Sequence, residues 1–172
     1  KGILLIFDEI QAGLGRTGRL WAGEHWNTTP DILCLAKGIA GGVPMGATLV
    51  RPDILAAISK GEHSSTFGGN PISCAAGIAA LTSITEDGLI ENSKKMGEIF
   101  REGLEKLKEK HTMIRDIRGK GLMIGIEMKF EVKDILMGLI QEGVLMLYSG
   151  RNILRILPPL VIKEEDVTKV LH

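Results

Sequence analysis

Near the start of the chain, the segment Ile3-Leu4-Leu5-Ile6-Phe7-Asp8-Glu9 has five apolar residues in a row followed by two carboxylates. A continuous apolar run, unlike an alternating one, is typical of a strand that is covered on both faces in a parallel sheet. The same pattern returns in residues 32–35, which lead to Lys37-Gly38, and again in residues 47–50. The first part of the chain therefore predicts three such strands in an α/β fold.

Helix signals follow these strands. Pro52 and Asp53 predict the start of a short helix that ends at Gly61, and Asn70-Pro71 is a good N-cap and first-turn pair for a helix through about Thr85. The second helix is rich in Ala, Gly and Ser, so another backbone or a cofactor can approach it closely. Composition shifts near residues 86–88, which predicts one domain over residues 1–87 and another over residues 88–172.

The second half predicts a small α+β domain. An amphipathic helix is expected over residues 89–110, then strands over residues 113–118 and 122–128 joined by Gly119-Lys120-Gly121. Strands are also expected over residues 144–147 and 153–157, and a last helix from residue 163. A helix between these strands has an apolar face formed by Val132, Ile135, Leu136, Leu139 and Ile140.

Composition narrows the class of protein. In 172 residues, 44% are hydrophobic, and 21 Lys and Arg balance 21 Asp and Glu, which is typical of a soluble globular protein. Zero net charge argues against nucleic-acid binding, and no apolar run approaches the roughly 20 residues of a membrane span. Cys34 and Cys74 form no CxxC motif, so we expect a reducing cytoplasm, no disulfide framework and no metal site. Because Lys1-Gly2 leads directly into a strand, we interpret the chain as the C-terminal part of a longer protein.

Two ionisable residues lie where parallel α/β sheets bind ligands, beyond the carboxyl ends of strands. Asp8 follows the first strand and Lys37 follows the second. A strand-end carboxylate can hold a positive charge, and a partly desolvated lysine can act as a nucleophilic amine. Taken singly, an Asp at this place more often caps a turn, and a Lys before Gly is usually solvated.

Other motifs leave alternatives open. Residues 13–18 match GxGxxG, but no strand directly precedes them and no helical pattern follows, so we reject a dinucleotide site. Asp8-Glu9 also looks like the Mg²⁺-holding strand end of a P-loop ATPase, whose GxxxxGK[ST] loop would have to lie outside these residues. A structural module with Gly-rich turns is a third possibility.

Several short sequence motifs, taken together in their order along the chain, are more specific for one protein family than any single motif is. Their combination resembles the class-III pyridoxal-phosphate (PLP) aminotransferases of the ornithine, acetylornithine and 4-aminobutyrate group. The resemblance implies fold type I, with the end of a large, mostly parallel α/β domain followed by a small α+β domain. The blocks are Asp8-Glu9-Ile10-Gln11, Gly13-x-Gly15-Arg16-Thr17-Gly18, Leu35-Ala36-Lys37-Gly38, residues 65–71 (STFGGNP), residues 118–123 (RGKGLM) and residues 154–160 (LRILPPL).

The resemblance also implies site residues. Lys37 would bind the cofactor aldehyde covalently and move a proton as base and acid, and Asp8 would pair with the pyridine nitrogen. Gln11 would lie near the phenolic oxygen of the cofactor. Thr66, with Ser65 close by, would reach the phosphate of the cofactor in the neighbouring subunit, which implies a homodimer.

For the substrate, the resemblance implies that Arg155 binds the α-carboxylate; without it, an edge-strand Arg facing water would be the expected role. It implies amino transfer from an ω-amino donor to 2-oxoglutarate. The short connection between Met128 and Val132 looks closer to enzymes acting on N-acetylornithine, or on lysine or ornithine held by a carrier protein, in arginine or lysine biosynthesis. Aminotransferases of 4-aminobutyrate or ornithine, and racemases of the same fold, remain alternatives. These residues alone are expected to be inactive, because the rest of the phosphate and substrate sites would lie upstream.

Overall fold

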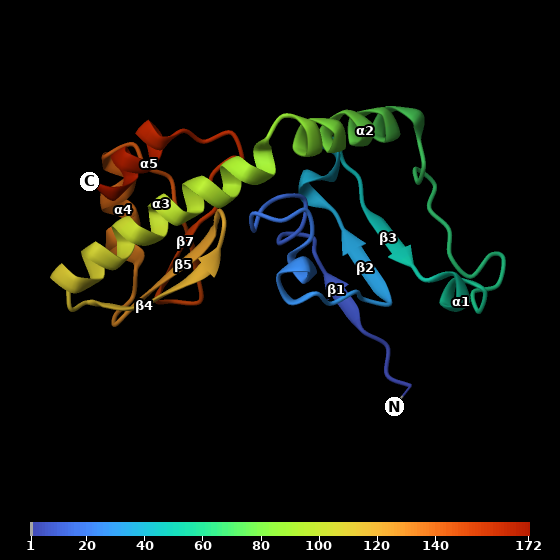
Figure 1. Ribbon diagram of the computed structural model, residues 1–172, viewed down its shortest axis with the longest axis horizontal. Coiled ribbons are helices and arrows are strands. Elements are labelled where there is room, and N and C mark those ends of the chain that lie inside the picture. Colours follow the sequence, from blue (N-terminus) through green and yellow to red (C-terminus); the bar gives the residue numbers. More distant parts are fainter. Residues whose placement is uncertain (1) are drawn as a thin grey trace. The chain divides into compact units, whose positions relative to one another are not determined.

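The computed structural model describes residues 2–172, which form two compact units (Figure 1). The first unit contains residues 2–15 and 19–89, and the second contains residues 16–18 and 90–172. The chain therefore leaves the first unit for three residues, 16–18, and returns to it. The assignment of residues 1–87 to a cofactor-binding domain and of residues 88–172 to a small domain stays a prediction.

The first unit is built on a three-stranded sheet in the order β1-β2-β3, with β1 at Ile6–Asp8, β2 at Ile32–Leu35 and β3 at Ala47–Val50. β1 and β2 are parallel, as predicted. β3 runs antiparallel to β2, so the prediction of a third parallel strand is wrong. Residues 36–46, which join β2 to β3, contain one 3₁₀ turn and no α-helix of the kind that usually forms the crossover between parallel strands.

The prediction of a strand buried on both faces over residues 3–7 is also wrong for this structure. The strand begins only at Ile6, and the side chains of Ile3 and Ile6 are 80% and 57% exposed. Among residues 2–172, only β2 pairs with β1, so the preceding residues have no second strand to continue the ladder.

The helices of the first unit agree only in part with those predicted from the sequence. α2 occupies Pro71–Glu86, close to its predicted bounds, and the Asn70 side chain caps it by accepting a hydrogen bond of 2.9 Å from Ser73 N. α1 is shorter than predicted, at Pro52–Leu55. Two 3₁₀ helices, η1 at Ala22–Trp26 and η2 at Lys37–Ala40, were not predicted because one turn is too short to show an apolar period.

The second unit packs helices on an antiparallel sheet of order β4-β5-β7-β6. The strands are β4 at Ile114–Lys120, β5 at Met123–Met128, β6 at Leu147–Ser149 and β7 at Ile153–Ile156. The helices are α3 at Leu89–Lys110, as predicted, α4 at Lys133–Gln141 and α5 at Glu164–Leu171. The most completely buried apolar side chains of this unit's core are those of Phe100, Leu122, Val132 and Val167.

Two details near α4 differ from the sequence prediction. β6 begins at Leu147, not at residue 144, because Val144 N donates a 2.8 Å hydrogen bond back to Leu139 O and so belongs to the turn that follows α4. The Ile140 side chain, predicted to be buried, is 50% exposed.

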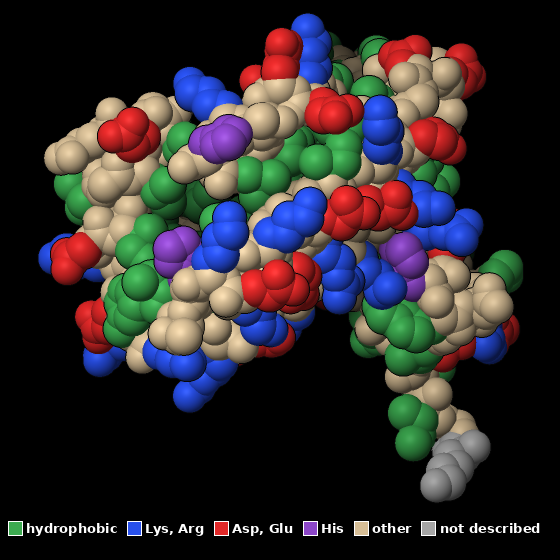
Figure 2. Space-filling model, turned by 60° about the vertical axis from the view of Figure 1, so that its left-hand side comes forward, with side chains coloured by type: hydrophobic (Ala, Val, Ile, Leu, Met, Phe, Trp, Pro, Cys, Tyr) green, Lys and Arg blue, Asp and Glu red, His purple; other side chains and the backbone are tan. Residues whose placement is uncertain are grey.

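Charged side chains of both signs are mixed over the face that Figure 2 shows, which agrees with the balanced composition. No helix within residues 2–172 is long and apolar enough to cross a membrane.

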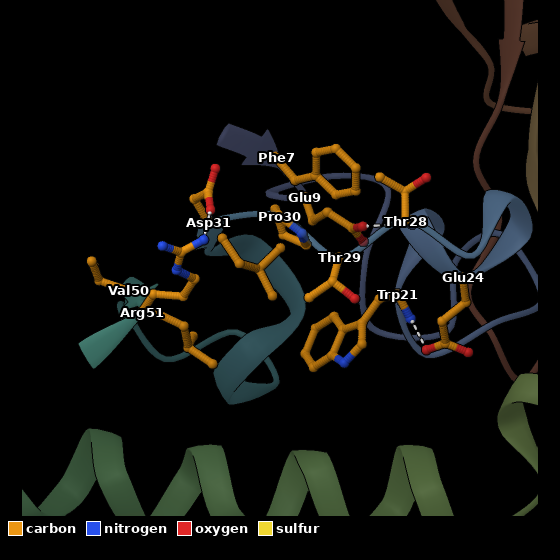
Figure 3. A pocket seen from close by; sticks show the side chains of 13 residues that line it. Phe7, Glu9, Trp21, Glu24, Thr28, Thr29, Pro30, Asp31, Val50 and Arg51 are labelled. Atoms are coloured by element: carbon orange, nitrogen blue, oxygen red, sulfur yellow. Dashed lines mark hydrogen bonds and ion pairs between the residues drawn. The ribbon is translucent and has the colours of Figure 1, made fainter. Parts of the chain in front are cut away.

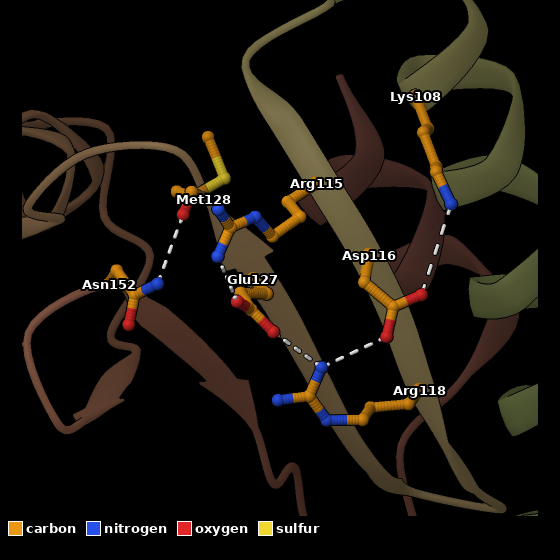
Figure 4. A network of polar contacts seen from close by, with 7 residues as sticks. All are labelled: Lys108, Arg115, Asp116, Arg118, Glu127, Met128 and Asn152. Carbon is orange, nitrogen blue, oxygen red and sulfur yellow. Dashed lines mark hydrogen bonds and ion pairs between the residues drawn. The ribbon is translucent and has the colours of Figure 1, made fainter.

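A chain of ion pairs lies across β4 and β5 (Figure 4). The Glu127 carboxylate accepts hydrogen bonds from Arg118, at 2.7 Å, and from Arg115, at 3.0 Å. Arg118 also donates to Asp116 at 2.9 Å, and Lys108 lies 3.9 Å from Asp116. Hydrogen bonding to Arg118 holds the pKa of both the Glu127 and the Asp116 carboxyl below its usual value.

Because the pKa of Glu127 is lower in the folded state, its contribution to stability is present at neutral pH and is lost as pH falls through that lowered pKa. We therefore expect Glu127→Gln to lose less stability on acidification below about pH 5 than the unmodified protein does. Urea unfolding midpoints measured across this range test the expectation. Glu98→Gln, on the exposed side of α3, is the matched control, and an equal acid response of Glu127→Gln and the unmodified protein would contradict the account.

Candidate active site

Strand direction brings Asp8 and Lys37 to one edge of the first sheet. β1 and β2 are parallel, and Asp8 pairs in register with Cys34. Lys37 follows the end of β2 by two residues and begins η2. Since the carboxyl ends of parallel strands share an edge, a carboxylate and an amine project from the same end of adjacent strands.

Asp8 is exposed, and its Oδ1 accepts a 3.1 Å hydrogen bond from the backbone N of Ile10. It therefore does cap the turn that follows β1, as the structural interpretation of a strand-end Asp requires. A carboxylate has two oxygens and about four acceptor positions, so this bond leaves capacity for a further donor.

Lys37 has an unusual backbone conformation. Its φ is +49°, in the left-handed region that non-glycine residues rarely adopt, and the preceding Ala36 is extended at φ −162°. Such a conformation costs about 1 kcal/mol and is found most often where function requires a particular side-chain direction. Ile39 and Ala40, 4% and 2% exposed, anchor the helix that begins at Lys37, while the Lys37 side chain itself is exposed.

The small residues of α2 allow η2 to pack closely, as the composition of this helix predicts. A Cβ on Gly77 would lie 3.1 Å from Met45 Sδ and 3.5 Å from the backbone oxygen of Ile39. A larger residue at 77 would press on η2, so α2 supports the backbone that carries Lys37.

Glu9 has a structural role, which sequence reasoning missed. Its side chain is 3% exposed, and its two oxygens accept hydrogen bonds from Ala22 N at 2.7 Å and Gly23 N at 2.9 Å. The carboxylate thus binds the free amides at the start of η1. It does not orient a water at the sheet edge, as a P-loop ATPase would need.

Glu9→Ala removes an acceptor from these two amides. Charge-assisted hydrogen bonds are worth about 1.5–3 kcal/mol each, and orphaned buried amides add a penalty, so we expect a loss of about 3 kcal/mol in the free energy of unfolding. Denaturant unfolding tests this, with Glu86→Ala, exposed in α2, as the control. Equal stabilities of the two variants would contradict the role given to Glu9.

A cavity of about 340 Å³ lies on the face of the first sheet opposite Asp8 (Figure 3). Phe7, Leu33 and Leu49 are register partners and contribute to its wall. Their neighbours Asp8, Cys34 and Thr48, also in register, point to the other face, because side chains alternate along a strand. This cavity therefore does not include the edge residues. The place of Thr48 on the Asp8 face depends on the antiparallel register of β3, which the sequence did not reveal.

The remaining residues expected in the first unit lie in turns and loops. Gln11 is half-buried in the turn after Asp8. Ser65 and Thr66 lie in the exposed loop before α2, where Gly68 N donates a 3.3 Å hydrogen bond to Ser65 O. The loop thus has a defined turn, and its Phe67 is 81% exposed.

Arg155 belongs to the second unit. It lies in β7, in register with Gly125 of β5 and Leu147 of β6, and is half-buried. It lines a cavity of about 230 Å³ whose other walls are apolar, among them Leu145, Leu157 and Pro158. Within residues 2–172, no cluster of three His, Cys, Asp or Glu could hold a metal ion.

Comparisons with known proteins agree on one family. The family model for aminotransferase class-III matches residues 1–172. The acetylornithine aminotransferase of Caldanaerobacter subterraneus subsp. tengcongensis is 47% identical over 171 residues, covering 99% of this chain and 43% of that protein. That of Methanocaldococcus jannaschii is 44% identical over 174 residues, covering 100% of this chain and 43% of that protein.

Solved structures give the same result. The acetylornithine aminotransferase of Elizabethkingia anophelis superposes with a TM-score of 0.92 at 40% identity, covering 98% of this chain and 44% of that one. The ornithine aminotransferase of Toxoplasma gondii gives 0.94 at 39% identity, with 98% and 41% covered. This chain thus spans less than half the length of these relatives.

These matches also identify the cofactor of the family. A second structure of the Toxoplasma gondii enzyme holds PLP at partial occupancy in its active site. An amine and a carboxylate on adjacent strand ends suit the two ends of PLP, an aldehyde and a basic ring nitrogen. Matched along its whole length and carrying these two groups at one sheet edge, the chain belongs to the class-III PLP-dependent aminotransferases.

Proposed function

We propose that the full-length protein containing this chain transfers an amino group from N-acetylornithine, or a related ω-amino donor, to 2-oxoglutarate. The observation that carries the proposal is the parallel register that places Asp8 and Lys37 at one edge. The names of the similar proteins support the donor. The corresponding role would be that of a cytoplasmic enzyme in arginine or lysine biosynthesis.

Each residue has a stated task in this proposal. PLP, when bound, supplies an aldehyde that accepts the amino group and a ring that draws electrons from the reacting carbon. Lys37 Nζ holds the cofactor between turnovers, then takes a proton from the donor's amine-bearing carbon and returns it as an acid. The Asp8 carboxylate keeps a proton on the ring nitrogen, and the Gln11 amide donates to the ring's phenolic oxygen.

Other groups bind the ends of the ligands. Arg155 takes the donor's α-carboxylate with its planar guanidinium. Thr66, with Ser65 beside it, binds the phosphate of the cofactor in a second copy of the protein, so the active form is a homodimer. The apolar side chains of Phe67, on this loop, and of Ile72 and Ile78, on α2, are exposed. Exposed apolar side chains gathered on one segment often mark an interface, so they support a contact surface for the second copy there.

The nearest alternative donor is ornithine itself, because structures of ornithine aminotransferases superpose with a TM-score of 0.94. 4-Aminobutyrate, lysine or ornithine on a carrier protein, and racemisation on the same scaffold are further alternatives. The P-loop ATPase alternative is disfavoured, because the Glu9 carboxylate binds backbone amides.

A donor panel tests the proposal. The purified full-length protein is mixed with 2-oxoglutarate and, in turn, N-acetylornithine, ornithine, 4-aminobutyrate or carrier-bound lysine, and glutamate formation is measured. We expect the highest kcat/KM with N-acetylornithine. Absence of glutamate with every donor, together with absence of a visible PLP chromophore, would overturn the proposal. Racemisation without 2-oxoglutarate would favour the racemase alternative.

A further inference from the structure

Residues 16–18 are the three residues that belong to the second unit although their neighbours in the chain belong to the first. They pass beside Gly121, in the turn between β4 and β5, where a Cβ has no room. A Cβ on Gly121 would lie 2.7 Å from Gly18 N and 2.9 Å from Arg16 O, and a Cβ on Gly97 would lie 2.6 Å from Gly121 Cα. The glycines therefore allow the backbone of residues 16–18 to pack closely against this turn.

Arg16 is held beside this turn by hydrogen bonds of both its backbone and its side chain. Its carbonyl accepts hydrogen bonds of 3.0 Å from Ser93 Oγ and from Leu122 N. Its Nη1 donates to Pro158 O and, at 3.4 Å, to Leu122 O. The Arg16 side chain is half-buried, and this burial lowers the pKa of its guanidinium.

The segment after β7 needs such a partner. Pro158 and Pro159 have no backbone N–H, so this stretch is hydrogen-bonded through its carbonyls. Pro158 O accepts from Arg16, and Pro159 O accepts a 3.0 Å bond from Ile162 N. Further along, Asn92 Nδ2 donates to Leu160 O at 2.6 Å. Arg16 thus bonds the chain two residues after the end of β7.

Arg155 lies three residues before Pro158, and both line the same cavity of about 230 Å³. We propose that Arg16 is a positioning residue: by holding Pro158 O, it fixes the cavity wall and the direction in which Arg155 meets a carboxylate. The inference rests on the proposed function, because that assigns the carboxylate to Arg155. Arg16 itself does not touch the substrate.

The test uses the full-length holoenzyme and two readouts. Calorimetry gives the Kd of glutarate, a dicarboxylate probe, and steady-state kinetics give KM and kcat for N-acetylornithine. Arg16→Ala is expected to raise both the Kd and KM about tenfold, as the loss of one charge-assisted contact implies, with kcat and the PLP absorbance nearly unchanged. Arg19→Ala, an exposed arginine three residues along, is the matched control.

A double-mutant comparison separates positioning from general damage. If Arg16 acts through Arg155, Arg16→Ala has little further effect on glutarate binding in an Arg155→Ala background. If Arg16→Ala does not fold, Arg16→Lys, which keeps one donor, is compared in the same way and is expected to give a smaller rise in Kd.

Three results would overturn the inference. The first is an unchanged Kd of glutarate in Arg16→Ala. The second is a rise in this Kd on Arg16→Ala that is equally large in the Arg155→Ala background. The third is glutarate binding that Arg155→Ala does not weaken. The calorimetry does not depend on turnover. If glutarate binds as expected but no donor yields glutamate, the proposed function fails while the inference about Arg16 stands.

Discussion

Replacing Lys37 with alanine is expected to abolish covalent attachment of PLP and to lower kcat by about 10⁴-fold, the upper range for loss of a positioned acid and base. In the proposed mechanism Lys37 is both the amine that holds the cofactor and the group that moves the proton, and the variant has neither. The strained backbone of Lys37 directs this side chain from the sheet edge, and no residue nearby in the sequence offers a second amine. Folding should be little affected, because the side chain is exposed.

Borohydride treatment followed by peptide mass spectrometry measures the attachment. The unmodified full-length protein is expected to carry a reduced pyridoxyl group on the peptide that contains Lys37, and Lys37→Ala to carry none. Lys60→Ala, an exposed lysine in the same unit, should behave like the unmodified protein. A label on Lys60, or activity retained in Lys37→Ala, would contradict the assignment.

Replacing Asp8 with asparagine is expected to lower kcat by about 10²–10³-fold, in the range found when one preorganised electrostatic group is removed from a site. An amide is nearly the same size as the carboxylate but has no charge to keep the ring nitrogen protonated. PLP attachment through Lys37 and the KM of the donor should change little, so the loss falls on the chemical step.

Steady-state kinetics and the absorbance spectrum of the holoenzyme test this split between kcat and KM. Asp134→Asn, an exposed residue of α4, is the control for a change of one charge. A variant with raised KM and normal kcat would show that Asp8 binds the donor and does not act on the ring.

The elements that sequence reasoning predicted well are those whose signals are local. α3 has an uninterrupted amphipathic period, and α2 has an Asn70 cap followed by Pro71, so their bounds follow from neighbouring residues. The direction of β3 and the start of β1 depend instead on which strands pair across the sheet. A run of apolar residues predicts a strand but not its partners.

The same distinction applies to the candidate site. Asp8 and Lys37 could be predicted to share an edge, because the apolar runs before them indicate adjacent parallel strands. The roles of Glu9 and Arg16 could not, because their partners lie 13 to 14 and 77 to 142 residues away in the chain. The structural role of the GxGxxG match at residues 13–18 likewise depends on glycines that are distant in the sequence, such as Gly121.

In the proposed site, Asp8 and Lys37 hold opposite ends of one pyridoxal ring. A crystal structure of the full-length protein grown with PLP measures this directly. We expect continuous density from Lys37 Nζ to the cofactor and an Asp8 oxygen about 2.7–2.9 Å from the ring nitrogen. A cofactor bound elsewhere, or one attached to Lys37 with its ring nitrogen facing a different residue, would contradict it.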